Sequence, residues 1–246
     1  MDRKLDLVES YGSTFRDLIN AKVQPAKLPI REALKLSKDE DWDFLCTSMD
    51  IIEDACLVID NFVRFGLDGP TKYDEGGERY LRLYGILSAT YIQQEAVLKL
   101  YQLMNVPPSL KESRDVLDAL EIRLLRHKLS SHSTNYYDKD SNSIQTYAPI
   151  RVDLKGFHCG YMNFEEKKTH SVDLQSAINQ HLETLIEMLD KILDKAIKTL
   201  YKGQETCENC REFSERLDNL RIRRKGGIVT KLPDGRKLVL MTEPEI

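Results

Sequence analysis

One short segment of the chain contains the residue types needed to cleave a phosphodiester without a metal ion. It reads Arg126-His-Lys-Leu-Ser-Ser-His132, so an arginine and a histidine stand six positions apart. A histidine transfers protons near neutral pH, and an arginine keeps its positive charge beside a phosphorane dianion. With the 2′-hydroxyl of RNA as the nucleophile, these two groups are sufficient for cleavage. Arg126 and His132 are therefore candidate catalytic residues.

The pattern of apolar residues predicts that this segment ends one long helix, from about Ser109 to His132. At 100° per residue, His132 falls within an arc of about 80° with the apolar residues that precede it, Ile122, Leu125 and Leu129. Arg126 lies about 120° around the helix from His132 and about 9 Å along its axis. A twofold axis would bring two such pairs together, so we expect a symmetric homodimer.

A purely structural interpretation of the same residues stays open. A histidine on an apolar helix face can be a buried core residue that bonds a carbonyl group. An arginine can cover apolar surface with the stem of its side chain. Under this interpretation His132 and Arg126 stabilise the fold and have no chemical role.

The rest of the chain predicts an all-α protein built around a bundle of four to five helices. A capping box at Ser37–Glu40 begins a helix that ends at Gly66, and Ser171 caps another that ends near Tyr201. Further helices are expected over about 1–20, 78–105 and 208–225, and short hairpins over 146–164 and 226–241. We divide the chain into an N-terminal helix and linker (1–36), the bundle (37–205) and a C-terminal extension (206–246).

Composition narrows the classes of function. The formal net charge is −4, which argues against a globally cationic nucleic-acid coat protein. The start of the chain has no signal-like apolar segment, and no run of apolar residues is long enough to span a membrane. We therefore expect a cytoplasmic protein with no membrane partner. Motifs of phosphate loops, dinucleotide-binding folds, zincins and α/β-hydrolases are missing.

The C-terminal extension begins with Cys207-Glu-Asn-Cys210, which has the spacing of a zinc knuckle but supplies only two of four ligands. The remaining ligands could come from His158 and Cys159 or from a second copy of the chain. Structural zinc and a pair of free thiols are the alternatives, and redox catalysis is less favoured because no βαβ unit accompanies the motif.

A basic cluster follows the two cysteines in the same extension. Four of its residues form the candidate RNA-binding set, Arg221, Arg223, Arg224 and Lys225. Such a cluster can contact a phosphate backbone, or it can be an ordinary solvated helix face.

The segment Arg126–His132, with His127 directly after the arginine, resembles the Arg-x(4–6)-His signature of the HEPN superfamily. The upstream segment Tyr91–Tyr101 is similar to the Glu-x3-Lys helices of that group, here with Glu95 and Lys99. The resemblance covers roughly residues 37–202. It implies a helical bundle that dimerises with the motif lining the interface cleft.

The resemblance also implies an activity, because many HEPN proteins are metal-independent endoribonucleases of toxin–antitoxin and antiviral systems. Arg126 and His132 would be the catalytic pair and His127 a supporting polar residue, with no cofactor required. RNA would be the substrate, and an antitoxin or another defence protein a partner. Some members carry a tyrosine two residues after the histidine, where this chain has Thr134. The alternatives are a non-catalytic module that binds nucleotides, RNA or protein, and a helical scaffold with a zinc-stabilised tail.

Overall fold

The computed structural model describes all residues except 1, 25–26, 72–75, 139–140, 232–236 and 242–246. The helices among the described residues are α1 (Asp2–Val23), α2 (Ile30–Ala33), α3 (Asp41–Phe65), α4 (Gly76–Leu103), α5 (Leu110–Asp118), α6 (Glu121–Arg126), the π-helical turn η1 (His127–Ser131), α7 (Leu174–Leu200) and α8 (Glu208–Arg224). The strands are β1 (Tyr136–Asp138), β2 (Ser143–Gln145), β3 (Tyr147–Lys155), β4 (His158–Asn163), β5 (Lys168–Asp173), β6 (Gly227–Lys231) and β7 (Lys237–Met241).

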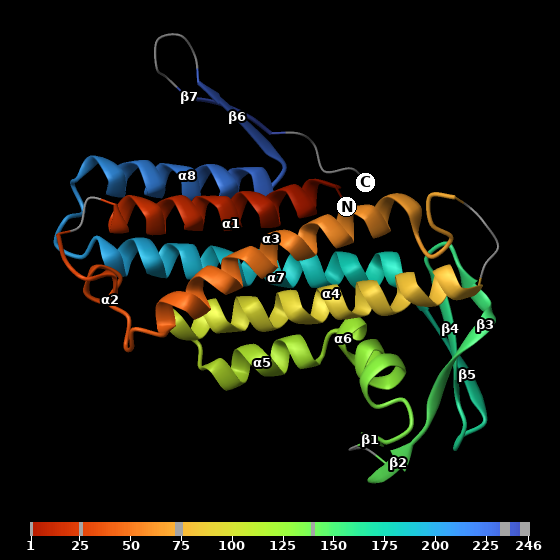
Figure 1. The fold of residues 1–246 in the computed structure, drawn as a ribbon. Coiled ribbons are helices and arrows are strands. Elements are labelled where there is room, and N and C mark those ends of the chain that lie inside the picture. Colours follow the sequence, from red (N-terminus) through yellow and green to blue (C-terminus); the bar gives the residue numbers. More distant parts are fainter. Residues whose placement is uncertain (1, 25–26, 72–75, 139–140, 232–236, 242–246) are drawn as a thin grey trace.

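Long helices α1, α3, α4 and α7 run side by side and form the body of the protein (Figure 1). Helix α8 packs on α1 and α7 on one side of this body, whereas α5 and α6 pack on α4 on the other side (Figure 1). Each long helix buries an apolar stripe. In α7 the stripe has a leucine or isoleucine at nearly every turn. The mostly helical fold is confirmed.

One hydrophobic core runs through all three segments of the sequence division. It includes Phe15 from α1, Ile59 from α3, Leu185 from α7 and Leu217 from α8. Helices α1 and α8 are therefore integral to the bundle and are not appendages to it. Among the described helices, none has the length and apolar character required to cross a membrane.

Among the described residues, three small antiparallel sheets accompany the helices, so the fold is not purely all-α. Strands β3 and β4 confirm the hairpin expected over 146–164, and β5 adds a third strand in which His170 pairs with Tyr161. The expectation that Ser171 caps α7 is wrong, because Ser171 belongs to β5. The carboxylate of Asp173 instead accepts hydrogen bonds from the first amide groups of α7, those of Gln175 and Ser176.

The ends of α3 confirm one expectation and correct another. Gly66 ends the helix with φ +57°, and its amide bonds the carbonyl of Phe62 at 2.7 Å. A Cβ at Gly66 would lie 2.6 Å from the backbone oxygen of Gly156, so glycine is required there. The Ser37 capping box does not form, because the helix begins at Asp41 after a Glu40 N-cap without a side-chain bond.

The predicted long helix from Ser109 to His132 is in fact three elements. Ser109 begins α5 with a capping box to Glu112, and α5 ends at Asp118. The chain turns at Leu120, which has an extended backbone, and α6 then begins. The last turn before His132 is π-helical, since the amide of His132 donates to the carbonyl of His127, five residues earlier, at 2.9 Å.

Candidate active site

The guanidinium group of Arg126 lies over the ring of Tyr91. Its central carbon is 3.8 Å from the ring centroid, at the end of α6 where Arg126 is half-buried against α4. One Nη of Arg126 approaches Nδ1 of His127 at 3.4 Å, and the Nε atom is buried without a hydrogen-bond partner. Tyr91 therefore holds the arginine by its face and leaves hydrogen-bonding capacity for a further acceptor.

His127 lies between Arg126 and His132. The rings of His127 and His132 stack with centroids 6.0 Å apart and an interplanar angle of 24°. His127 also meets the ring of Tyr91 edge-on, with centroids 5.9 Å apart. The structure thus brings together all three residues of the predicted catalytic set, because Arg126 and His132 both contact His127.

The π-helical turn corrects the predicted orientation of His132. Leu125 and Leu129 are buried in the core, as the apolar stripe predicts, but His132 is exposed. A hydrogen bond from i to i+5 adds a residue to the turn and shifts every later side chain around the axis. The buried core histidine of the alternative interpretation is therefore not His132.

Burial lowers the pKa of His127 below its usual range, and the charges of Arg126, Arg123 and His132 lower it further. The imidazole is consequently neutral at neutral pH. A neutral ring can accept the hydrogen bond from Arg126 at Nδ1, which leaves the proton on Nε2.

A second arginine, Arg123, contacts the same tyrosine ring. Its side chain is 3% exposed and its guanidinium carbon lies 4.7 Å from the centroid of Tyr91. It donates to Glu95 at 2.6 Å and to the amide oxygen of Gln94 at 3.0 Å, and its Nε lies 2.7 Å from an oxygen of Asp118. A buried charge needs such pairing, and these contacts fix Arg123 against the face of Tyr91.

This network continues into the core through His181, which is completely buried. Gln94 donates to Nδ1 of His181 at 3.0 Å, and the Nε2–H of His181 bonds Gln93 at 2.9 Å. Gln93 in turn donates to the carbonyl of Ile52 at 2.9 Å. The sequence analysis did not identify Tyr91, His181 or the two glutamines as parts of the site. The signal in the sequence is a pair of adjacent glutamines on α4 and a histidine on α7, each on an otherwise apolar stripe.

Lys128 anchors the π-helical turn to the neighbouring strands. Its Nζ lies 5.1 Å from the ring centroid of Tyr147, and within 6 Å of those of Tyr136 and Tyr161. The three rings pack edge to face. Tyrosines of two neighbouring sheets, β1–β2 and β3–β4–β5, therefore hold the turn from which His127 and His132 extend.

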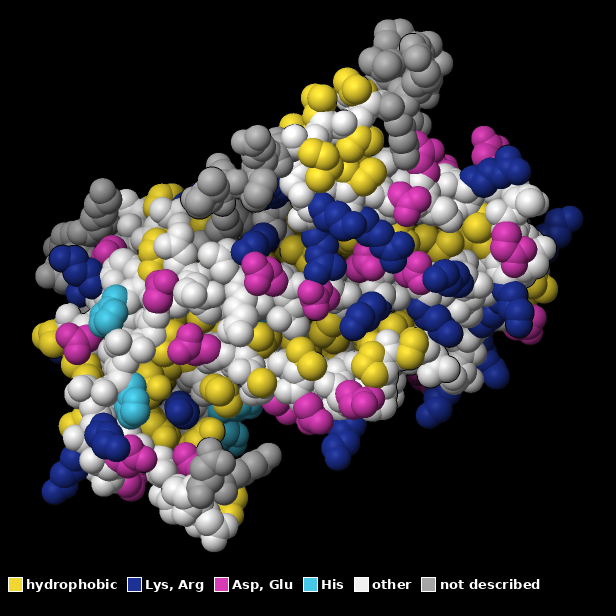
Figure 2. Space-filling view, turned by 180° about the vertical axis from the view of Figure 1, so that it is seen from behind, with side chains coloured by type: hydrophobic (Ala, Val, Ile, Leu, Met, Phe, Trp, Pro, Cys, Tyr) yellow, Lys and Arg dark blue, Asp and Glu magenta, His cyan; other side chains and the backbone are white. Residues whose placement is uncertain are grey.

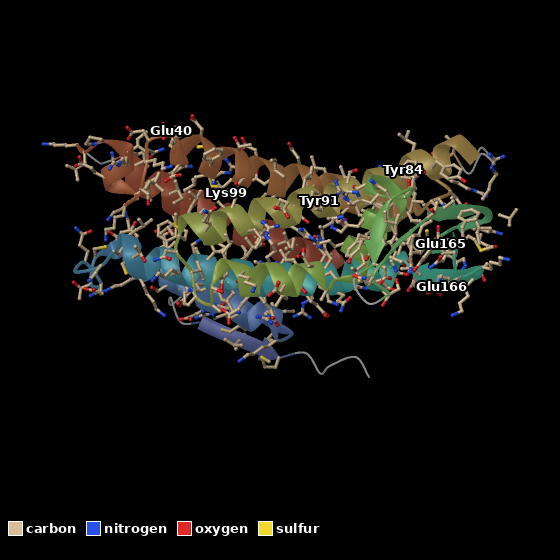
Figure 3. All side chains as sticks on the ribbon, turned by 90° about the horizontal axis from the view of Figure 1, so that it is seen from below. Glu40, Tyr84, Tyr91, Lys99, Glu165 and Glu166 are labelled. Carbon is tan, nitrogen blue, oxygen red and sulfur yellow. The ribbon has the colours of Figure 1, made fainter. Side chains whose placement is uncertain are left out.

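Glu95 and Lys99, which carry the Glu-x3-Lys resemblance, have separate roles. Glu95 binds Arg123 and Arg114 beside the site. Lys99 lies further along α4 than Tyr91 (Figure 3), where its Nζ is 4.1 Å from the ring centroid of Phe44. Glu95 therefore belongs to the site, whereas Lys99 packs α4 against α3.

Two arginines of the candidate RNA-binding set form ion pairs within the fold. Arg221 binds Asp190 of α7 through two hydrogen bonds of 2.9 Å, and Arg224 lies 2.6 Å from Glu187. Basic and acidic side chains alternate across the face of the molecule in Figure 2. These ion pairs give Arg221 and Arg224 a role in docking α8 on α7.

The other two residues of this set differ in their surroundings. Arg223 donates to the hydroxyl of Ser10 on α1 at 3.0 Å, whereas Lys225 is exposed. Helix α8 lies on the opposite side of the bundle from α6 and η1 (Figure 1). RNA that contacts His132 would not reach α8 of the same protomer directly, and the RNA-binding role of this set stays a prediction.

The proposed zinc partners are far apart. Cys159 is buried in β4 beside the start of α7, and Cys207 and Cys210 follow the end of α7. The helix between them has 27 residues, which is about 40 Å. His158 and Cys159 therefore cannot complete a site with this pair in one chain. Among the described residues, no group of three or more metal-ligating side chains comes together.

Comparisons with known proteins supply no further assignment: no family model, curated protein or solved structure matches the chain.

Proposed function

We propose that this chain is a metal-independent endoribonuclease of the HEPN type, acting in toxin–antitoxin or antiviral defence. The observation that carries the proposal is the cluster of Arg126, His127 and His132 beside Tyr91. One arginine has free hydrogen-bonding capacity, one histidine is neutral because of its surroundings, and one histidine is open to solvent. This is the set of groups that intramolecular cleavage of RNA requires.

In the proposed reaction, His132 accepts the proton of the RNA 2′-hydroxyl as that oxygen attacks the adjacent phosphorus. Arg126 stabilises the negative charge of the phosphorane, and Tyr91 and His127 keep its guanidinium in place. The bond from phosphorus to the 5′-oxygen then breaks, and the leaving oxygen takes up a proton. The products carry a 2′,3′-cyclic phosphate and a 5′-hydroxyl.

We propose that two copies assemble with their sites facing each other. Helix α4 carries an exposed apolar stripe at helical spacing next to Tyr91, formed by Leu81, Tyr84 and Ile92, which are 73%, 38% and 46% exposed. Exposed apolar patches commonly mark protein interfaces. A partner seated on this stripe would bring a second arginine and a second pair of histidines toward the scissile phosphate, and one of them could protonate the leaving oxygen.

Incubation of the purified protein with end-labelled RNA in excess EDTA tests the proposal. We expect cleavage that persists in EDTA, yields 2′,3′-cyclic phosphate ends and is lost in Arg126→Ala. The matched control is Arg64→Ala, since Arg64 lies on α3 with an exposed ion pair to Asp60. Cleavage that is equal in wild type and Arg126→Ala would contradict the assignment.

The same reactions separate the enzyme from its main alternative, a HEPN-like module that binds without catalysis. Such a module would retain RNA or nucleotide on a filter and leave the RNA intact. Retention of uncut RNA by a folded, dimeric wild-type protein would therefore favour the binding module. Loss of retention in Arg126→Ala would place binding at the same residues.

A further inference from the structure

At the start of α8, two thiols stand one helical turn apart with unequal exposure. Cys207 is the N-cap residue and is half-exposed, whereas Cys210 is buried three positions later. We infer that Cys207 and Cys210 form a reversible disulfide by exchange with a small acidic disulfide of the glutathione class. This inference is independent of the proposed ribonuclease activity.

A hydrogen bond already holds the sulfur of Cys207 close to the backbone of Cys210. The amide nitrogen of Cys210 lies 3.4 Å from Sγ of Cys207, to which it donates a hydrogen bond. Because the Cα of Cys210 is one bond from this nitrogen, it is within about 5 Å of that sulfur. The sulfur of Cys207 is thus already directed at the backbone of Cys210, and rotation of the Cys210 side chain is the movement that brings the two sulfur atoms together.

The sulfur of Cys207 lies among polar and basic groups at the start of α8. The sulfur of Cys207 lies at the positive end of the α8 dipole, where it accepts an amide hydrogen bond. Lys22 lies close by, with its Nζ 3.3 Å from the side-chain oxygen of Gln204 and 4.4 Å from the ring centroid of Tyr201. Burial, and next the charge of Lys35, lower the pKa of Lys22, while the two thiols act in the opposite direction.

A cavity of about 620 Å³ opens beside Cys207, between the ends of α1 and α7, α2 and the start of α8. Three lysines line it, Lys22, Lys35 and Lys202, together with two glutamates, Glu32 and Glu208. The excess of positive charge suits a small disulfide that carries carboxylates. The cavity therefore identifies the acidic class of disulfide as the preferred reactant.

The exchange is balanced in two steps. The Cys207 thiolate attacks one sulfur of the small disulfide, which forms a mixed disulfide and releases one thiolate. The thiolate of Cys210 then attacks Sγ of Cys207, which forms the Cys207–Cys210 bond and releases the second thiolate. The protein loses two thiol protons and two electrons, and the small disulfide becomes two thiols.

Mass spectrometry of the full-length protein in buffers of reduced and oxidised glutathione tests the inference. We expect loss of two mass units as the oxidised fraction rises, reversal by reduced glutathione, and a peptide map that links Cys207 to Cys210. Cys210→Ala should stop at the mixed disulfide on Cys207, and Cys207→Ser should form neither product. Cys46→Ser is the matched control, because Cys46 is a half-exposed cysteine on α3 whose thiol pKa burial raises, and it should react as the wild type does.

Comparison of reactants tests the role of the cavity. Glutathione disulfide should react about tenfold faster than uncharged hydroxyethyl disulfide at low ionic strength, and Lys22→Gln should reduce this difference. Two results would overturn the inference: failure of folded wild type to form the Cys207–Cys210 link at any glutathione ratio, or stoichiometric zinc on purified protein that blocks the thiols until a chelator removes it. A chain that forms the link with equal rates for both reactants would overturn the assignment of the cavity.

Discussion

The guanidinium carbon of Arg126 lies 3.8 Å from the ring centroid of Tyr91, and that of Arg123 lies 4.7 Å from the same centroid. One tyrosine on α4 thus contacts two arginines of α6. Arg123 is paired with Glu95 and Asp118, whereas the Nε of Arg126 is buried without a hydrogen-bond partner. Tyr91 is a positioning residue for the proposed reaction, since it acts through Arg126.

Two replacements of Tyr91 should therefore distinguish the contribution of the aromatic ring from that of the hydroxyl group. Tyr91→Leu removes both cation–π contacts, and we expect kcat for EDTA-resistant RNA cleavage to fall about tenfold, which corresponds to about 1.4 kcal/mol. Tyr91→Phe keeps the aromatic face and should retain most of the activity. Equal losses in the two variants would show that the ring face does not hold Arg126.

The network of Arg123 predicts that replacing two arginines that share one carboxylate will lower the free energy of unfolding by different amounts. Arg123→Met leaves Glu95, Asp118 and Gln94 without their buried donor and should lower the free energy of unfolding by about 3 kcal/mol in urea titration. Arg114 binds the same Glu95, but its side chain is 43% exposed. Arg114→Met should cost less than about 1 kcal/mol. Similar costs for both variants would argue against a structural role for the network.

His181 predicts a loss of stability in mild acid. Burial lowers its pKa to about 3, whereas the unfolded chain has a histidine pKa of about 6.5. The unfolded state therefore takes up the proton first, so stability is full above about pH 6.5 and falls by about 1.4 kcal/mol per pH unit as the pH drops toward 3. Urea titrations at pH 7 and pH 5 measure this difference. His181→Gln should reduce it, and His158→Gln, at an exposed site on β4, should keep it; an unreduced difference in His181→Gln would contradict the assignment.

The ion pairs of α8 predict which basic residues stabilise the fold. Arg221→Gln breaks the two-bond contact with Asp190 and should lower the thermal midpoint by several degrees, whereas Lys225→Gln should not change it.

The RNA-binding hypothesis makes a separate prediction. Neutralisation of Arg221, Arg223 and Arg224 should weaken RNA binding and flatten its dependence on salt, and an unchanged salt slope would contradict that role.

The sequence predicted the elements whose apolar periodicity is long. Helices α1, α3, α4, α7 and α8 lie within a few residues of their expected bounds, because each buries a stripe that repeats over several turns. The hairpin β3–β4 followed from short alternating segments. The turn expected between β6 and β7 lies outside the described residues, although both strands confirm the predicted hairpin.

The π-helical turn could not be predicted from local sequence. Leu129 is buried on the apolar stripe whether the turn is α-helical or π-helical, so the periodicity does not distinguish the two forms. Distant contacts hold the turn, above all those of Lys128 with the rings of Tyr147 and Tyr161. The same limit applies to the site: the spacing of Arg126 and His132 is visible in the sequence, but Tyr91 and Arg123 join them through tertiary packing.

The central claim is that His132 transfers a proton in RNA cleavage and does not stabilise the core. The most direct measurement combines the rate of EDTA-resistant cleavage and the thermal midpoint on one preparation of His132→Ala. We predict a rate at least about 100-fold below wild type with an unchanged midpoint, because His132 is exposed. Leu129→Ala, three residues earlier and in the buried stripe, should lower the midpoint, and His158→Ala should change neither quantity. Full activity in His132→Ala, or an activity loss that merely follows a fall in the midpoint, would contradict the claim.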